Sequence, residues 1–447
     1  MLAEQAYQTT TEVNVGMTNI STEPYWWAAA PPQDFEMDSW PTRADVVIIG
    51  GGYTGFGAAI PLARAGLDVV ILERDQIGSG ASTRNGGITS GNLRVSLDKL
   101  TKKFGKEKAT AFYREGKIAR EDLFDFIKTE KIACDLQNCG RMVGALRPDS
   151  FESMKRDAEK LNVLLNINTK VCERSDLPDY IDTSRYCGGI LRNDIGGIHP
   201  AKLLTGMCKI ALAESVKIST QTRVLSVSKT NQTSTTSDFR VETSRGIISA
   251  GHVISATNAY TDKGQPWLRR RLVPVISEMI ATEELGENMV RSLMPGLNMY
   301  SEALELGHYY RPSPDGKRIL LGGRRMSPDP AKARDRLISG LASIFPQLSG
   351  VSISNHWFGF VAFPFDQLPK LAVHDGVIYP SGFCGSGTVW ARWLGQKAAH
   401  MVLGDLQDSV FQGVPFRTMP FYSGDPWFLP LAMNFYAIRD KFKTTTK

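Results

Sequence analysis

The strongest pattern of hydrophobic and polar positions is in "ADVVIIGGGYTGFGAAIPLARAGLDVVILERD", residues 44–75. Its two short apolar runs, "DVVII" and "DVVIL", are typical of buried strands. The glycine turn between them leads into an apolar segment that is long enough for a helix. We therefore expect a strand–helix–strand unit over residues 44–75.

The hydrophobic period changes several times further along the chain. Residues 101–170 have an apolar position every three to four residues, which predicts helices, and residues 196–215 predict a turn followed by a helix. Residues 216–230 and 238–257 alternate with the two-residue period of strands. Residues 376–404 close with a strand, a second glycine turn and a helix. This mixture predicts an α/β fold of mixed α+β type.

Composition limits the classes of function. The chain has 447 residues, of which 42% are hydrophobic and 22% are charged, enough for a large core in two or three domains. The net charge is +6, and no block of Lys and Arg indicates a nucleic-acid partner. No apolar run approaches the ~18 residues of a membrane span, and no secretory signal is visible.

The six cysteines are irregularly spaced and match no disulfide or metal-binding motif. We therefore expect a reduced, cytoplasmic protein without a metal site. The sequence also contains no G-x-S-x-G turn, H-E-x-x-H motif or Walker loop, so hydrolase, metalloprotease and kinase functions lack support.

The first glycine turn predicts a dinucleotide site. Gly50, Gly52 and Gly55 fit G-x-G-x-x-G directly after a strand and before a helix. The first glycine permits the tight turn, the second admits a pyrophosphate, and the third allows close packing of helix and strand. Glu73 ends the second strand, where a carboxylate can bind ribose hydroxyls.

A second loop of small residues, "RDQIGSGASTRNGGI" (74–88), follows directly. A nicotinamide domain would normally continue into another strand–helix repeat here. A loop rich in glycine and hydrogen-bonding side chains instead favours FAD, whose bulky ring extends past the first site. The alternative is a flexible surface loop.

Several motifs in order resemble the D-amino-acid oxidase superfamily of FAD-dependent oxidoreductases, most closely its gamma-glutamylputrescine oxidoreductase branch. These motifs are the two glycine loops, "GIHPAKLL", "ATNAYT", "YYRPSPDGKRILLGG" and "FCGSGTVWARWLGQKAA". The resemblance implies a Rossmann-like FAD-binding domain and a substrate-binding domain on an antiparallel or mixed sheet. The expected ranges are 44–100, 187–262 and 355–410 for the FAD domain, 101–186 and 263–354 for the substrate domain with a helical insertion, 1–43 for an N-terminal arm, and 411–447 for a C-terminal extension.

The resemblance also implies which residues bind FAD. The first turn, the second loop, a strand at 222–227, the segment after the next strand, and the second glycine turn would all contribute. No cysteine stands at Phe360 or Val361, and no histidine lies in "GSGASTRNGG", so FAD is expected to be non-covalent. The expected FAD-binding residues are Gly50, Gly52, Tyr53, Thr54, Gly55, Glu73, Arg74, Gly80, Ala81, Ser82, Asn85, Gly86, Gly87, Val224, Ala256, Thr257, Gly385, Ser386, Gly387 and Thr388.

The residues expected at the substrate-binding site differ from those of the amino-acid oxidases. Pro314 stands where those relatives carry a carboxylate-binding arginine, and Arg311 is expected to point to the other side of its strand. The candidate catalytic or pocket residues are Tyr310, Trp357 and His356. His199, which precedes a proline at a helix start, is expected to cap that helix rather than act as a base.

The resemblance thus implies an FAD-dependent enzyme that oxidises the C–N bond of a secondary or acylated aliphatic amine to an imine, which hydrolyses to an aldehyde and an amine. Electrons would pass to O2 or another acceptor. The alternatives are oxidation of an amino acid or a 2-hydroxy acid on the same fold, a flavin-binding subunit without activity, or a nicotinamide enzyme. The particular amine and the oligomeric state stay open.

Overall fold

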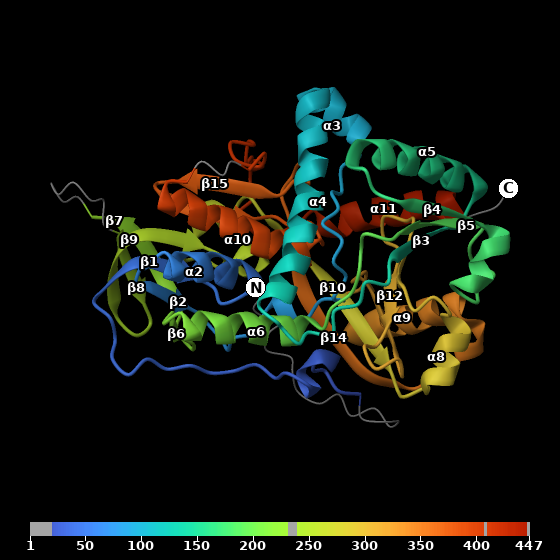
Figure 1. Ribbon diagram of the computed structural model, residues 1–447, viewed down its shortest axis with the longest axis horizontal. Coiled ribbons are helices and arrows are strands. Elements are labelled where there is room, and N and C mark those ends of the chain that lie inside the picture. The colour runs from blue at the N-terminus through green and yellow to red at the C-terminus, as the bar shows by residue number, and fades with distance from the viewer. Residues whose placement is uncertain (1–19, 231–238, 406–408, 445–447) are drawn as a thin grey trace.

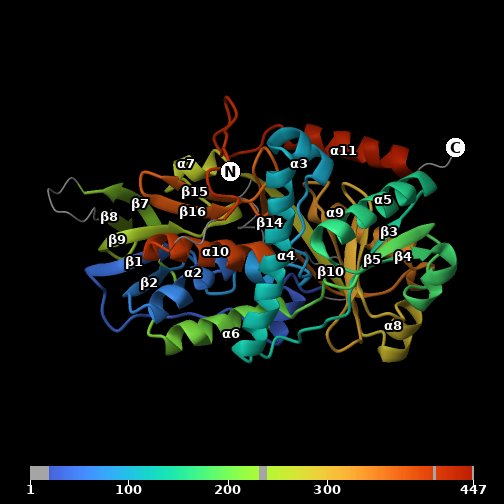
Figure 2. The same cartoon turned by 45° about the horizontal axis from the view of Figure 1, so that its top comes forward.

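The computed structural model describes residues 20–230, 239–405 and 409–444. Two eight-stranded sheets lie side by side, and α4 (Lys106–Thr129) crosses between them (Figure 1). The turned view separates the helices over the first sheet from those against the second (Figure 2). The predicted mixed α/β fold is confirmed.

The first sheet has the strand order β15-β16-β9-β1-β2-β6. Strand β1 (Arg43–Ile49) lies parallel to its two neighbours, β2 (Val69–Leu72) and β9 (Ile247–Ser255). These strands are covered on both faces, which explains their nearly continuous apolar sequences. The other strands of the sheet are β6 (Lys217–Ser219), β7 (Val224–Lys229), β8 (Phe239–Thr243), β15 (Lys370–His374) and β16 (Val377–Ser381).

Helices bury one face of the first sheet in a common core, in which Phe56, Phe112 and Trp390 are fully buried. Strands β7 and β8 extend this sheet from β9, with which β8 pairs, and their apolar side chains join the core on its other face. The predicted strand–helix–strand unit and the closing strand–turn–helix unit are both present. The helices over the first sheet, besides α4, are α2 (Tyr53–Arg64), α6 (Pro200–Ala213) and α10 (Gly387–Leu403).

The second sheet has the order β14-β10-β13-β12-β11-β3-β5-β4. Helices α8 (Glu287–Leu293) and α9 (Pro330–Ile344) pack against one of its faces. Its strands are β3 (Arg141–Ala145), β4 (Thr169–Glu173), β5 (Gly188–Arg192), β10 (Val273–Thr282), β11 (Met299–Glu302), β12 (Tyr309–Pro312), β13 (Ile319–Arg324) and β14 (Ile353–Phe363). The remaining α-helices of the described residues are α3 (Leu97–Phe104), α5 (Pro148–Leu165), α7 (Pro266–Arg269) and α11 (Leu429–Thr444).

The predicted domain ranges differ from this arrangement in three elements. Strands β5 and β14 pair within the second sheet, although both fall in ranges expected for the FAD domain. Helix α4 falls in the range expected for the substrate domain but buries its apolar face in the core of the first sheet. The hydrophobic period identifies a strand or helix but not the sheet that it joins, and β14 passes from one sheet toward the other.

The described part of the N-terminal arm is packed against the protein. Trp26 is fully buried, and its indole N–H donates a hydrogen bond to the Asn85 carbonyl at 2.8 Å. The Trp27 indole N–H donates to the Thr83 hydroxyl at 2.9 Å. These contacts hold this part of the arm against the second loop, and residues 1–19 of the expected arm lie outside the described residues. Among the described helices, none is long and apolar enough to cross a lipid bilayer.

Helices α2 and α10 cross at glycines. A Cβ on Gly57 would lie 2.5 Å from the carbonyl oxygen of Arg392, and a Cβ on Gly395 would overlap the carbonyl of Thr54. Each glycine therefore permits backbone contact where any other residue would force the two helices apart. The crossing places the N-termini of both helices at the same edge of the first sheet.

We predict that Gly395→Ala lowers the free energy of unfolding by about 1–3 kcal/mol, the usual cost of overpacking a tight site. The methyl group would push α10 away from the Thr54 backbone, outweighing the gain of up to about 1 kcal/mol in helix propensity. Denaturant unfolding of the variant and the wild type measures the change. A variant of equal or greater stability would show that the crossing tolerates a side chain.

Candidate functional site

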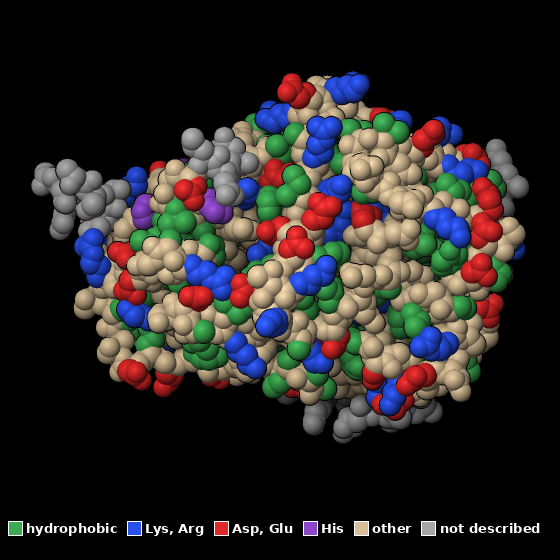
Figure 3. Space-filling model, viewed as in Figure 1, with side chains coloured by type: hydrophobic (Ala, Val, Ile, Leu, Met, Phe, Trp, Pro, Cys, Tyr) green, Lys and Arg blue, Asp and Glu red, His purple; other side chains and the backbone are tan. Residues whose placement is uncertain are grey.

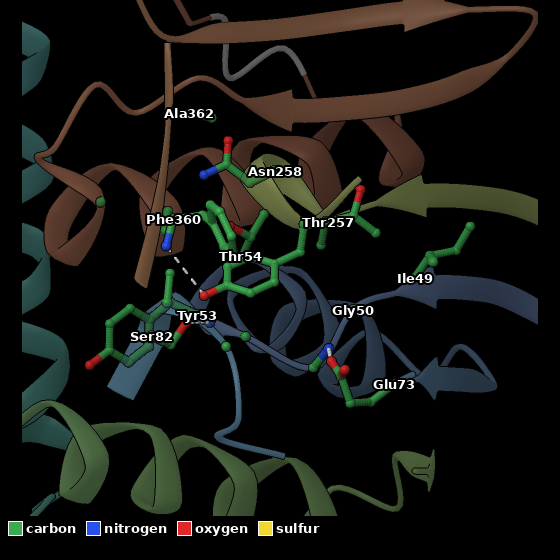
Figure 4. A pocket seen from close by; sticks show the side chains of 18 of the residues that line it. Ile49, Gly50, Tyr53, Thr54, Glu73, Ser82, Thr257, Asn258, Phe360 and Ala362 are labelled. Carbon is green, nitrogen blue, oxygen red and sulfur yellow. Dashed lines mark hydrogen bonds between the residues drawn. The ribbon is translucent and has the colours of Figure 1, made fainter. Parts of the chain in front are cut away.

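A cavity lies at the carboxyl ends of β1, β2 and β9 (Figure 4). It contains ≈ 1310 Å³ of space between atoms, including some at its open side. The lining comes from segments far apart in the sequence: the first glycine turn, the second loop, the start of β7, the end of β9, the end of β14, and the start of α10. Such an edge of an α/β sheet is where ligands of these folds bind.

The first glycine turn requires glycine at each motif position. Gly50 has φ +107°, and a Cβ there would lie 3.1 Å from the Ala256 carbonyl oxygen. Gly52 is the N-cap of α2, where a Cβ would lie 2.9 Å from the Ser82 hydroxyl. A Cβ on Gly55 would overlap the Gly50 carbonyl. The turn thus keeps the start of α2 free of side chains. The first turn of a helix has N–H groups that can bind an anion.

The Glu73 carboxylate is bound beside this turn. Its Oε2 accepts a hydrogen bond from the Gly51 N–H at 2.8 Å, and its Oε1 accepts one from the Asp75 N–H at 3.0 Å. Burial raises the pKa of Glu73, and these N–H groups oppose that rise. Because each carboxylate oxygen has further lone pairs, Glu73 can still accept hydrogen bonds from a ligand in the cavity.

The second loop is a fixed wall of the cavity. The Asn85 side-chain amide donates to the carbonyls of Ala81 at 3.1 Å and Ser82 at 2.9 Å, and its oxygen accepts from the Gly87 N–H at 2.8 Å. The Ser82 hydroxyl accepts from the Tyr53 N–H at 3.0 Å, which ties the loop to α2. This network rules out the alternative of a flexible surface loop.

The second glycine turn closes the other end of the cavity. Cys384 and Gly385 both have positive φ, at 52° and 96°, so the chain reverses sharply before α10. Gly387 and Thr388 in the first turn of α10 line the cavity. The Thr388 hydroxyl lies 3.4 Å from the Asn85 side-chain oxygen, linking this turn to the second loop. A second helix N-terminus therefore lies at the same cavity as α2.

Most of the residues expected to bind FAD line this cavity. Gly55, Gly86, Gly87 and Ser386 lie outside the lining. The residues that do line it are Gly50, Gly52, Tyr53, Thr54, Glu73, Arg74, Gly80, Ala81, Ser82, Asn85, Val224, Ala256, Thr257, Gly385, Gly387 and Thr388.

Sequence reasoning missed several lining residues. Asn258, directly after the predicted Thr257, lines the cavity, and its side-chain oxygen accepts from the Gly382 N–H at 2.8 Å. Tyr260 and Phe360 form an edge-to-face pair with ring centroids 5.5 Å apart and give the cavity an aromatic section. The "ATNAYT" motif gave a signal for the first two, whereas Phe360 was noted only as a position without cysteine.

The candidate catalytic residues lie away from the cavity lining. Tyr310 faces the helix-covered side of the second sheet, where its hydroxyl bonds to that of Tyr186 at 2.9 Å. His356 lies near Glu278, with 3.5 Å between Nε2 and Oε1. Trp357 is buried, and its indole N–H donates to the Arg84 carbonyl at 3.0 Å. None of these three side chains lines this cavity, and their role at the substrate stays a prediction.

Strand alternation explains this difference for β12. Neighbouring residues point to opposite faces of a sheet, so Tyr309 and Tyr310 cannot share a face. A Cβ on Gly86 would lie 3.0 Å from the Tyr309 ring, so Tyr309 points toward the second loop. The Tyr309 hydroxyl bonds to that of Ser277 at 3.1 Å.

Arg311 shares the face of Tyr309, opposite to that of Tyr310. Its Nη1 donates to the Ile198 carbonyl at 2.7 Å, and its Nη2 donates to the Gln137 side-chain oxygen at 2.6 Å. Burial lowers its pKa to about 10. The Arg311 guanidinium is thus hydrogen-bonded within the protein interior and is not free to bind a carboxylate.

His199 caps α6, as expected. Its Nδ1 accepts a hydrogen bond from the Lys202 N–H at 3.2 Å, the geometry of an N-cap. Burial lowers its pKa to about 4, so the ring is neutral at physiological pH and keeps the lone pair that capping requires.

Comparison with known proteins points to one family. The family described as "FAD dependent oxidoreductase" (DAO) matches residues 45–401. Gamma-glutamylputrescine oxidoreductase of Escherichia coli K12 is 30% identical over 437 residues, covering 95% of this chain and 99% of that protein. A probable oxidoreductase, OrdL, of Rhizobium meliloti is 28% identical over 93% of this chain and 97% of its own.

Solved structures share the fold. Glycine oxidase from Geobacillus kaustophilus has a TM-score of 0.70 at 18% identity, covering 85% of this chain and 99% of that chain. L-proline dehydrogenase from P. horikoshii has a TM-score of 0.66 at 18% identity, covering 88% and 99%.

We predict that Gly52→Val abolishes most nucleotide retention. The branched side chain would meet the Ser82 hydroxyl and cover the N–H groups at the start of α2. The absorbance of nucleotide released from equal amounts of purified variant and wild type measures the change. Circular dichroism of the variant must show a folded protein. A folded variant with full nucleotide content would show that the turn is not the phosphate site.

Proposed function

This chain belongs to the DAO family of FAD-dependent oxidoreductases, and on that premise we propose that it oxidises the C–N bond of a secondary or acylated aliphatic amine. The observation that supports the assignment of FAD to the cavity is its pair of helix N-termini, from α2 and α10, beside glycines whose side chains would fill the space. FAD, when bound, accepts a hydride from the carbon next to the nitrogen.

The proposed roles of the lining residues follow from the family resemblance and agree with their places in the cavity lining. The start of α2, with Gly50 and Gly52, binds the diphosphate through backbone N–H groups. Glu73 accepts hydrogen bonds from ribose hydroxyls. The backbone of Val224 contacts adenine, and the N–H groups of Thr388 and its neighbours stabilise negative charge at the pyrimidine edge of the ring.

FAD is bound non-covalently, and the state of Cys384 agrees with this. Its thiol donates a hydrogen bond to the Gly382 carbonyl at 3.2 Å, and burial raises its pKa to about 12. A thiol with such a pKa is protonated at physiological pH, and the thiolate is the nucleophile in cysteine chemistry.

We also propose the cytoplasm as the location of the protein. All six cysteines are free thiols, which suits a reducing compartment. The electron acceptor is O2 or another oxidant of the same compartment.

The substrate proposal rests on two features. The relative from Escherichia coli is named for an acylated diamine, and Arg311 is engaged by the protein interior, so the position beside Tyr310 provides no clamp for an α-carboxylate.

We predict that acid precipitation of the purified yellow protein leaves FAD in the supernatant. Without a covalent link, unfolding releases the cofactor. Absorbance spectra of the supernatant and the washed pellet measure the distribution. Flavin retained in the pellet after denaturation would contradict non-covalent binding.

We predict that N-acylated diamines and secondary aliphatic amines bleach the flavin band faster than glycine, sarcosine or D-alanine. The measurement is anaerobic mixing of each compound with the holoenzyme, followed by absorbance. Fast bleaching by D-alanine or a 2-hydroxy acid, with no response to long amines, would favour the amino-acid or hydroxy-acid alternative. No bleaching by any compound would favour a flavin-binding subunit without activity.

A further inference from the structure

Exposed hydrophobic side chains are concentrated in the C-terminal segment 421–442. Hydrophobic residues that are exposed singly are normal on a protein surface, whereas a contiguous set marks a site of interaction. Phe421, which is 98% exposed, and the exposed Trp427 precede α11. The exposed apolar side chains on α11 itself are Leu431, Phe435, Ile438 and Phe442.

These four residues, called the α11 stripe below, lie on one side of the helix. They follow one another at intervals of four, three and four positions, which is the spacing of one helical face. Met433 and Asp440, on the opposite side, are buried. A surface helix normally turns its apolar stripe toward the core, whereas α11 presents one outward.

The orientation of α11 is fixed by contacts with the rest of the protein. The Asp440 carboxylate accepts hydrogen bonds from the N–H groups of Glu305 at 3.0 Å and Leu306 at 2.7 Å. Arg147 Nη1 donates to the Phe442 carbonyl at 2.9 Å. The segment before the helix packs in a small apolar cluster, and α11 lies along the outer edge of the molecule (Figure 2). The stripe therefore faces away from the protein.

Basic residues flank the stripe. At about 100° per residue, Arg439 and Lys441 lie on its two sides, and both are exposed. Asp440, the one acidic residue in the α11 sequence, is buried on the far side of the helix. Glu305, which lies 3.6 Å from Arg439, is also 3.6 Å from Arg94. The exposed side of α11 is thus apolar with positive flanks, whereas the face shown in Figure 3 has basic and acidic side chains interspersed.

We propose that α11 docks the protein on the surface of an anionic lipid bilayer. The α11 stripe enters the boundary between headgroups and lipid tails, and Arg439 and Lys441 reach the headgroup phosphates from its flanks. The helix has 16 residues and a single apolar stripe, so it lies on the bilayer and does not cross it. The cytoplasmic leaflet of a membrane is negatively charged, which agrees with the proposed cytoplasmic location.

The charges favour a bilayer over a second copy of the chain. Packing two α11 stripes together would bring Arg439 and Lys441 of both copies to one contact, and like charges at an interface are unfavourable. Asp440 is buried on the other side of the helix, where it already accepts two N–H groups. Anionic headgroups around an apolar layer match both features of the surface.

The first test is co-sedimentation of the holoenzyme with vesicles of phosphatidylcholine and phosphatidylglycerol. We expect binding that weakens as the salt concentration rises, because salt screens surface charge, and weaker binding to phosphatidylcholine alone. Ile438→Ser should lower the partition coefficient by about fivefold or more, since it removes an apolar side chain that enters the bilayer. Ile118→Ser on α4 is the matched control, because Ile118 is 50% and Ile438 54% exposed, and it should bind as the wild type does.

The second test removes a flanking charge. Arg439→Gln should lower binding to the anionic vesicles by about fivefold and change binding to phosphatidylcholine vesicles by less than about twofold. Lys217→Gln, on the edge strand β6 of the first sheet, controls for the loss of one positive charge. None of these substitutions lies in the cavity lining, so flavin content and turnover without vesicles should match those of the wild type.

Three outcomes would overturn the proposal. The first is a wild-type protein that does not bind anionic vesicles, or binds neutral and anionic vesicles equally. The second is equal vesicle binding by the wild type and Ile438→Ser. The third comes from light scattering without vesicles: a wild-type dimer that Ile438→Ser converts to a monomer, with no vesicle binding by either, would assign the α11 stripe to self-association.

Discussion

The contact between α2 and α10 is the constraint on which the rest of the structure depends. Each helix starts at the cavity and crosses the other at a glycine, Gly57 or Gly395, where backbone meets backbone. A wider separation would move one N-terminus away from the ligand that both face. The helices come from opposite ends of the chain, so this single crossing joins the first strand–helix–strand unit to the last. The glycines of the cavity lining then keep the space between the two N-termini free of side chains.

The two faces of the second sheet have different roles: one packs in a core, and the other contacts the second loop. The face with Tyr310 packs against α8 and α9, and its polar groups satisfy one another. The opposite face carries Tyr309 and Arg311 toward the second loop, where Arg311 donates hydrogen bonds to the Gly86 and Gly87 carbonyls. This arrangement explains how the second loop is held against the second sheet.

The sequence predicted those turns, strands and helix caps that depend on residues close together in the chain. The glycine turn before Tyr53, the strand that ends just before Glu73 and the capping role of His199 each depend on residues close in sequence, and each is present. The sheet to which β14 belongs and the face to which Tyr310 points depend on pairings with distant strands. A one-residue change of phase exchanges the two faces of a strand, so a residue can be assigned to the correct strand and to the wrong side.

The wide spread of the cavity lining along the chain has a consequence for biosynthesis. The lining begins at Ile49 and is complete only at Ala391. On the ribosome, the first glycine turn and α2 emerge long before β9, β16 and α10, so the nascent chain has no complete site for its cofactor during most of translation. The apolar surface of α2 that later meets α10 stays uncovered over the same period, when exposed apolar surface promotes aggregation. The cofactor is therefore expected to bind late, after α2 and α10 have packed against each other.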